Sequence, residues 1–204
     1  MSAGGLDGLP REDISGKITP TFLMNLSSPD WKIRLESIDS VNKILEEANK
    51  HIQPTGTSML IFSLGLPAEL FGALRGRLYD SNKNLVMATL VVVGGVASAM
   101  GPMVEKSSKG ILSNVLKCLS DNKKHMRECT INTLDSWVAA IHLNKMVPYV
   151  TVALADTKIG VEGRKDLFDW LTKQISGMSD SSEALHLLKP STYSLTVYII
   201  SLSL

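Results

Sequence analysis

Three segments of this chain, beginning at Leu26, Leu78 and Leu119, can be aligned with one another. The leucines lie 52 and 41 residues apart (78 − 26 and 119 − 78). In each segment a Ser or Asp is followed by a Trp or Lys, and then by apolar residues at helical spacing. Self-similarity at this spacing is typical of a helical solenoid, in which stacked helix pairs share one core. The matching positions are Ser28, Asp80 and Asp121; Trp31, Lys83 and Lys124; Ile33, Leu85 and Met126; Ile38, Leu90 and Ile131; and Val41, Val93 and Leu134.

The apolar pattern predicts a helix on each side of every shared turn, because apolar residues recur three and four positions apart. Pro20 should lie near the start of the first helix or kink it. Gly94 and Gly95 should let a neighbouring helix approach closely. The sequence therefore predicts an all-α chain, an α-solenoid of antiparallel helix pairs with about four and a half repeats. The expected helices cover about 14–26, 33–48, 67–78, 85–100, 104–119, 126–141, 146–154, 167–175 and 181–189.

Two segments depart from this pattern. Residues 58–67 lengthen the first interval and are apolar, unlike a surface loop. Residues 191–204 are rich in Ser, Thr and β-branched side chains, so their local preference is for a strand. Their composition and abrupt edges favour translated intervening sequence as the origin of both. We expect a flexible leader at 1–10, an incomplete repeat domain at 11–190 with an atypical insert at 58–67, and an unrelated tail at 191–204.

Composition narrows the class of function. The 21 basic and 20 acidic residues give a net charge of +1, so no overall field attracts nucleic acid or an anionic membrane. Cys118 and Cys129 are expected to be reduced, buried thiols, because no second cysteine pair completes a zinc site. The histidines are scattered, and neither a phosphate loop nor a nucleophile motif is found. The sequence thus predicts a binding module without catalytic residues, metal or cofactor.

The shared turns are the best candidate for a binding site. In a stack of antiparallel helix pairs, the turns within pairs lie along one edge, so their residues form a row. A Trp beside basic residues has the composition of a protein-docking hot spot, and an acidic partner surface would complement it. The residues in and around the turns are Trp31, Lys32, Arg34, Asn82, Lys83, Asn84, Lys123, Lys124, Arg127, Arg164 and Lys165.

Each of these residues also has a purely structural interpretation. Trp31 could pack under the first turn, and each lysine could be a solvated charge. Arg34 and Arg127 could bridge to a carboxylate or a helix end of the neighbouring repeat. Asp80 and Asp121 are better explained as helix caps than as contacts with a partner.

Five stretches, at 9–15, 28–36, 77–86, 119–127 and 163–171, together resemble the TOG domain of the microtubule polymerase family, a module built from HEAT repeats. The resemblance is to a fourth-TOG-like module of plant members. It implies that the turns within repeats bind αβ-tubulin. Carried over by position, the tubulin-binding residues are Trp31 and Lys32 in the first turn, Asn82 and Lys83 in the second, Lys123, Lys124 and Arg127 in the third, and Arg164 and Lys165 in the fourth.

The resemblance also implies a setting. Family members act on microtubules, speed tubulin addition and are not enzymes. For this chain it implies a monomeric, cytoplasmic module of the microtubule cytoskeleton and spindle, with αβ-tubulin as partner and with neither nucleic acid nor membrane. The alternatives are a generic HEAT-type protein scaffold that binds through its second helices, and a poorly folded fragment without activity.

Overall fold

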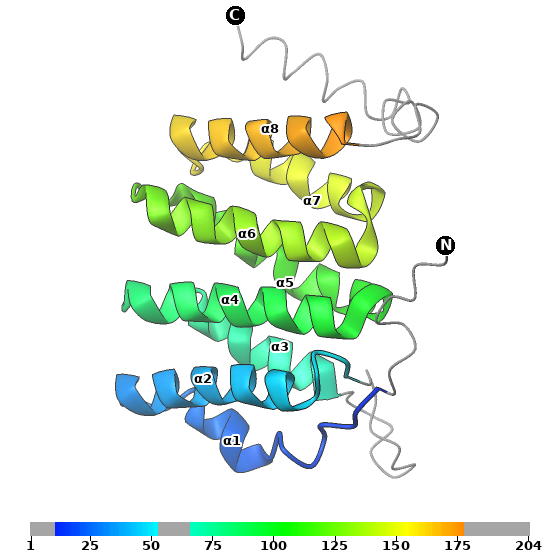
Figure 1. The fold of residues 1–204 in the computed structure, drawn as a ribbon. Helices are drawn as coiled ribbons and strands as arrows, with labels where there is room; N and C mark the ends of the chain where they lie inside the picture. Colours follow the sequence, from blue (N-terminus) through cyan, green and yellow to red (C-terminus); the bar gives the residue numbers. More distant parts are fainter. Residues whose placement is uncertain (1–10, 53–65, 178–204) are drawn as a thin grey trace, which may run out of the picture.

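The computed structural model describes residues 11–52 and 66–177, and within these ranges it contains helices and no β-strand (Figure 1). This confirms the predicted all-α solenoid of helix pairs. Residues 1–10, most of the insert at 58–67, the helix expected at 181–189 and the tail at 191–204 lie outside the described residues. The helices are α1 (Pro20–Asn25), α2 (Trp31–Glu47), α3 (Leu66–Arg77), α4 (Lys83–Met100), η2 (Gly101–Val104), α5 (Glu105–Lys117), η3 (Cys118–Ser120), α6 (Lys124–Ile141), α7 (Leu143–Ala155) and α8 (Val161–Ser176).

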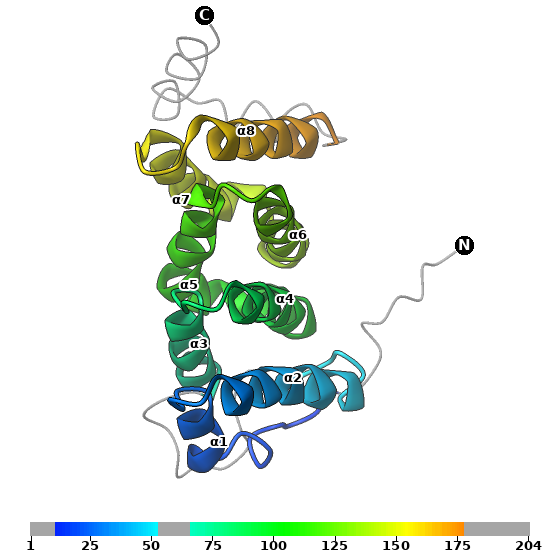
Figure 2. The same cartoon turned by 90° about the vertical axis from the view of Figure 1, so that its left-hand side faces the viewer.

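The pairs stack into two layers. Helices α1, α3, α5 and α7 form one layer, and α2, α4, α6 and α8 form the other (Figure 2). Apolar side chains fill the space between them, and Leu26, Leu74, Leu85 and Leu119 are among those fully buried. Burying one such side chain stabilises the fold by about 1.5–3 kcal/mol. The stack is therefore held mainly by the apolar stripes that the sequence predicts.

Helix α4 lies between α2 and α6, and its two glycines permit this packing. A Cβ on Gly94 would lie 3.1 Å from Ser136 Oγ of α6, and one on Gly95 would lie 3.3 Å from Leu45 Cδ1 of α2. The expectation that these glycines allow close helix approach is confirmed. The stretch from Lys83 to Ser120 is long and apolar enough to cross a membrane by composition alone, but 61% of its most apolar part is buried in the molecule, as in a core helix of a soluble protein.

Two helices begin elsewhere than predicted. Helix α1 begins at Pro20, which confirms the expectation that Pro20 lies near its start, whereas residues 14–19 precede the helix. Thr19 caps it: the Phe22 N–H donates to Thr19 Oγ1 at 3.2 Å. Pro suits the first helical position because its fixed φ is helical and no N–H is lost. Helix α7 begins at Leu143, directly after His142, whose φ of 64° ends α6.

The N-terminal segment binds the edge of the stack where α2 and α4 end. Arg11 donates to the carbonyls of Ile52 and Met100, each at 3.1 Å, and the Glu12 N–H donates to His51 O at 2.8 Å. Gly101 ends α4 with a φ of 59°, a conformation that a side chain disfavours. Because this segment joins α2 to α4 at the edge opposite the shared turns, it leaves those turns uncovered.

Candidate functional site

The first to fourth turns, which join α1 to α2, α3 to α4, α5 to α6 and α7 to α8, share one backbone arrangement. In each, a Ser or Asp side chain accepts a hydrogen bond from the backbone N–H two residues further on. The aligned positions of the first three turns are therefore structurally equivalent, whereas the fourth turn runs two residues further to its helix cap at Gly160. We call the edge that these turns form, which faces the viewer in Figure 2, the turn edge. The bonds run from Asp30 N–H to Ser28 Oγ (3.2 Å), Asn82 N–H to Asp80 Oδ1 (3.0 Å), Lys123 N–H to Asp121 Oδ1 (2.9 Å) and Lys158 N–H to Asp156 Oδ1 (2.9 Å).

Trp31 is the first residue of α2, and its surface is 47% exposed. The helix begins here because Asp30 caps it, with the Lys32 N–H donating to Asp30 Oδ1 at 2.8 Å. Lys32 Nζ lies 6.0 Å from the centroid of the indole ring, where a cation–π attraction operates. The alternative in which the ring packs under the turn is wrong, because about half of the residue remains accessible.

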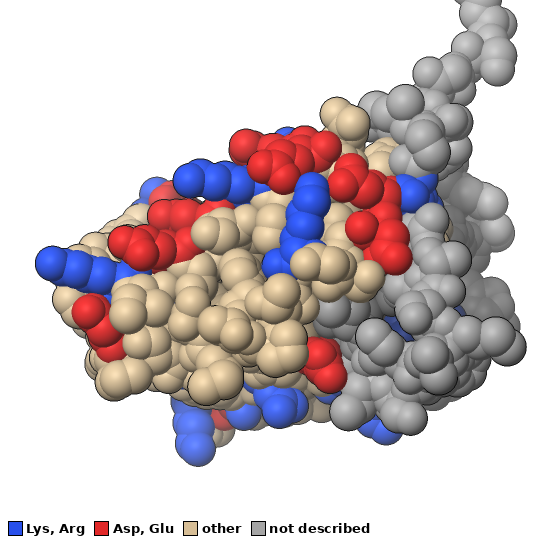
Figure 3. All heavy atoms as spheres, turned by 90° about the horizontal axis from the view of Figure 1, so that it is seen from below, with Lys and Arg blue, Asp and Glu red and all other residues tan. Residues whose placement is uncertain are grey.

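The end of the solenoid beside this turn is sparsely charged. Helix α1 has the sequence PTFLMN without a charged side chain, and Met24 and Ile33 are exposed. Figure 3 views this end and shows a broad uncharged area, with acidic and basic side chains along the top and others at the left and bottom of the drawn surface. The first repeat therefore combines an exposed indole with uncharged surface.

In the second turn, Asn82 is the cap of α4: its Oδ1 accepts from the Asn84 N–H at 3.0 Å. The expectation that Asp80 caps this helix is wrong, because Asp80 precedes the cap and bonds the N–H of Asn82 instead. Lys83 is exposed, and its Nζ lies 3.0 Å from Asp121 Oδ2 of the third turn. Lys83 thus links two neighbouring turns while keeping access to solvent.

Asp80 joins the first turn to the second. Its side chain is 3% exposed and lies 2.9 Å from Arg34 Nε and 3.0 Å from Arg77 Nη1. Arg34 also donates to the carbonyl of Ser28 at 2.7 Å. Burial pushes the pKa of Asp80 upward, but the Asn82 N–H and the Arg34 guanidinium outweigh it and hold the pKa below its usual value. The interpretation of Arg34 as a bridge between repeats is confirmed.

Arg127 of the third turn also bridges to the next repeat. It is 6% exposed, its Nε donates to Asp166 Oδ2 at 2.6 Å, and its Nη1 donates to the carbonyls of Asp121 and Asn122 at 3.2 and 3.0 Å. The bridging interpretation is confirmed here too. The bridging role is favoured over the predicted contact with a partner, because the guanidinium would have to leave these buried bonds to make that contact.

The other basic residues of the third and fourth turns are more accessible. Lys123 and Lys124 are exposed, and Lys124 Nζ lies 3.2 Å from Glu128 Oε1. Arg164 donates to the carbonyl of Ile159 at 2.6 Å. Lys165 is exposed, and its hydrogen bond with Asp169, at 3.0 Å, raises the pKa of its ammonium group. These residues remain predicted contacts.

The turn edge is less basic than its sequence indicates. Lys83, Lys124 and Lys165 each form an ion pair, and the carboxylates that they meet neutralise part of the charge. Burial raises the pKa of Asp121, but the Lys123 N–H and the Lys83 ammonium outweigh it, so that its pKa is lowered and the carboxylate stays charged. Within residues 11–52 and 66–177, Lys32 and Lys123 belong to no ion pair.

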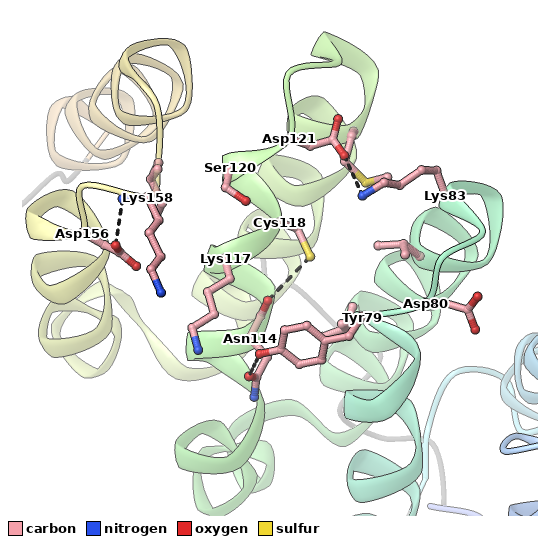
Figure 4. A pocket seen from close by; sticks show the side chains of 14 residues that line it. Tyr79, Asp80, Lys83, Asn114, Lys117, Cys118, Ser120, Asp121, Asp156 and Lys158 are labelled. Carbon is pink, nitrogen blue, oxygen red and sulfur yellow. Dashed lines mark hydrogen bonds and ion pairs between the residues drawn. The ribbon is translucent and has the colours of Figure 1, made fainter.

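The second turn lacks a feature that the other three share. The fourth residue of α2, α6 and α8 is an arginine that donates to carbonyls of its own turn, whereas α4 has Val86 there. Val86 lines a hollow of about 610 Å³ that extends from the second turn to the fourth (Figure 4). The sequence analysis did not single out Tyr79, Asn114, Lys117 or Lys158, which also line it. The valine at position 86, where the other three helices have an arginine, was the sequence signal that could have indicated this hollow.

The described residues give little support for a metal site or for a nucleophilic cysteine. No group of three or more His, Cys, Asp and Glu side chains in 11–52 and 66–177 could hold a metal ion. Cys118 and Cys129 are unpaired thiols. Burial raises the pKa of Cys118 to about 12 and also raises the pKa of Cys129, so neither thiol supplies a thiolate nucleophile near neutral pH.

Comparison with known proteins gives close relatives, although no family model matches the chain. The chain is 68% identical over 195 residues to Protein MOR1 of Arabidopsis thaliana and 72% identical over 194 residues to Protein MOR1 of Oryza sativa subsp. japonica, covering 96% and 95% of this chain. It is 30% identical over 190 residues, 92% of the chain, to Protein mini spindles of Drosophila melanogaster. The chain spans only 9% of the length of each of these relatives.

Solved structures share the fold. A structure from work on tubulin recruitment and assembly by microtubule polymerases with TOG domain arrays matches with a TM-score of 0.71, covering 87% of this chain and 34% of that chain at 16% identity. A structure from work on microtubule plus end tracking by XMAP215, CLIP-170 and EB1 matches with a TM-score of 0.69, covering 83% of this chain and 66% of that chain, also at 16% identity.

Proposed function

Because the chain belongs to the microtubule polymerase family that includes MOR1 and is a TOG domain, we propose that it is a non-enzymatic module that binds αβ-tubulin through its turn edge and promotes microtubule growth. The observation that carries the proposal is the shared arrangement of the four turns, which puts their residues in one row with an exposed indole at one end. The proposal is further supported by the relatives, whose names and subjects concern spindles and tubulin recruitment.

The residues of the turn edge would contribute to binding in different ways. Trp31 is the anchor, since a half-exposed indole gains most when a partner removes it from water. Exposed lysines steer the encounter with an acidic surface and mainly raise the association rate. Arg127 holds the third turn in place without touching tubulin. The proposed contacts are Trp31, Lys32, Asn82, Lys83, Lys123, Lys124, Arg164 and Lys165.

The anchor can be tested by Trp31→Ala. We expect its affinity for purified αβ-tubulin to fall about 30-fold, the equivalent of about 2 kcal/mol for a hot-spot residue. The measurement is a fluorescence titration, with helical circular dichroism to check that the fold is retained. An unchanged affinity in a folded variant contradicts the proposal.

The matched control also addresses the scaffold alternative. Val91 of α4 is 56% exposed in the layer of second helices, away from the turns, and this is the surface that a generic scaffold would use. Val91→Ala should leave tubulin affinity unchanged. If Val91→Ala weakens binding and Trp31→Ala does not, the result favours a generic scaffold that binds through its second helices.

The proposal includes a cellular setting. As a tubulin-binding module, the protein would act as a monomer in the cytoplasm, on microtubules and the spindle, with no nucleic acid, membrane, metal or cofactor involved. A fluorescent fusion that follows microtubules only when Trp31 is intact would agree with it.

A further inference from the structure

The hollow beside the second turn exists because one side chain of the repeat is short. Arg34, Arg127 and Arg164 each extend from the fourth position of their helix back to carbonyl oxygens of the preceding turn. Val86, at the same position of α4, is buried and cannot span that distance. The space of about 610 Å³ between the second, third and fourth turns is therefore left open along the turn edge (Figure 4).

Some charged side chains of this hollow form ion pairs, and others do not. Asp80 is paired with Arg34 and Arg77, and Asp121 is paired with Lys83. In contrast, Lys117 and Lys158 form no ion pair within the described ranges, 11–52 and 66–177. Figure 4 shows both side chains extending into the same space, Lys117 from the end of α5 and Lys158 from the turn before α8.

The remaining polar groups are largely engaged by the protein itself. The Tyr79 hydroxyl donates to Asn114 Oδ1, which fixes both side chains on one wall. Asp156 is the carboxylate nearest to Lys158 in sequence, and its Oδ1 accepts from the Lys158 backbone N–H. Of the charged side chains that line the hollow, Lys117, Lys158 and Asp156 form no ion pair within the described ranges, and one oxygen of Asp156 accepts a backbone N–H.

We propose that this hollow receives an aspartate or glutamate side chain of the protein that docks on the turn edge, with Lys117 and Lys158 as its ligands. A carboxylate in this hollow can form charge-assisted hydrogen bonds with the two ammonium groups. The space exceeds a single side chain, and ordered water fills the remainder. This inference rests on the proposed function and adds to it a second binding point on the turn edge, separate from Trp31 and formed by two lysines that are not among the predicted contacts.

The test compares two double variants that remove the same charge. Lys117→Gln with Lys158→Gln should weaken tubulin binding about fivefold, which corresponds to two partly exposed ion pairs. Lys106→Gln with Lys109→Gln is the control, because both residues are exposed on α5 near its opposite end. The control should bind like the unmodified chain. Equal affinities of the two double variants overturn the inference.

The comparison with Trp31→Ala separates this inference from the proposed function. If Trp31→Ala weakens binding and the Lys117/Lys158 variant does not, the hollow is not a contact, and the turn edge still binds tubulin. If the unmodified chain does not bind tubulin at all, the proposed function fails, and the hollow is judged with a hexaglutamate peptide as probe.

That second measurement uses the whole chain in solution. Titration with hexaglutamate, followed by NMR of the lysine side chains, should shift Lys117 and Lys158 more than Lys106 and Lys109, and added salt should reverse the shifts. Equal shifts at all four lysines, or none, overturn the proposal of a carboxylate site.

Discussion

At the residue scale, two glycines, one at the start of α8 and one in the middle of α5, differ in how closely their neighbours are packed. A Cβ on Gly163 of α8 would overlap the carbonyl oxygen of Leu119 and come 2.9 Å from Ile159 Cγ2. Gly110, in the middle of α5, is exposed and has nothing within 4 Å of the place of a Cβ. The first glycine is required by the contact between the third and fourth repeats, whereas the second is not required by any packing contact.

Gly163→Ala should therefore lower the free energy of unfolding by about 3 kcal/mol, because the overlapping atom is backbone and cannot move aside. Gly110→Ala should raise it by about 1 kcal/mol, the helix preference of Ala over Gly. Urea unfolding followed by circular dichroism measures both. Similar stabilities of the two variants would mean that α8 packs on η3 less closely than described.

At the element scale, the turns are joined to one another by charged side chains as well as by the apolar core. Arg34 reaches Asp80, Lys83 reaches Asp121, and Arg127 reaches Asp166, so a cation of each repeat meets a carboxylate of the next. Such pairs fix geometry more than they add stability, because removing charges from water costs much of what their attraction returns. We infer that they keep the turn edge straight enough to meet a flat partner.

Asp80→Asn should cost about 2 kcal/mol of unfolding free energy at neutral pH, since a charge-assisted bond is lost while the shape is kept. The native pKa of Asp80 is lowered, so its contribution is complete above the unfolded value of about 3.9 and is lost as pH falls through the native pKa. The difference between the variant and the unmodified chain should therefore shrink below about pH 4. Urea unfolding from pH 7 to pH 2.5 measures it.

The control for this prediction is Asp39→Asn, because Asp39 is exposed on α2 and joins no ion pair among the described residues. Its stability should match that of the unmodified chain at every pH. A difference for Asp80→Asn that stays constant down to pH 2.5 would assign its effect to packing rather than to charge.

At the scale of the whole molecule, the chain is nearly neutral, and the basic side chains that matter for docking are those of the turn edge. A net charge of +1 gives no long-range attraction, and much of the basic character of the turns is neutralised by neighbouring carboxylates. The lysines that retain exposure act within about 8 Å in physiological salt. Steering of a partner should accordingly be local and sensitive to salt.

Lys123→Gln with Lys124→Gln should slow association with tubulin about threefold at low salt, and the difference should vanish near 0.5 M salt because the charges are then screened. Stopped-flow fluorescence measures the rates. Lys43→Gln with Lys173→Gln changes the same charge on exposed residues in the second halves of α2 and α8, far from the turns, and should not slow association. Equal slowing by both pairs would point to net charge instead.

The helices, the repeat and the positions of the turns could be predicted because their signals are local. Apolar spacing places the stripes of α2, α4, α5 and α6, and the Ser or Asp of each turn marks its register. The exact starts of α1 and α7 depend on caps at Thr19 and His142, which spacing alone does not identify. The hollow was missed because Val86 looks like an ordinary core residue unless it is compared with the arginines at the same position.

The sequence by itself thus determined which residues lie in the turns and that the turns share one register, since both follow from helix periodicity and turn chemistry within a few residues. Only the tertiary structure decided which basic side chains are available to a partner. Arg127 is hydrogen-bonded to Asp166, and Arg34 to Asp80, because stacking brings together residues about forty positions apart in sequence. Lys117 and Lys158 remain without an ion-pair partner in the described ranges, although the carboxylate of Asp156 lines the same hollow.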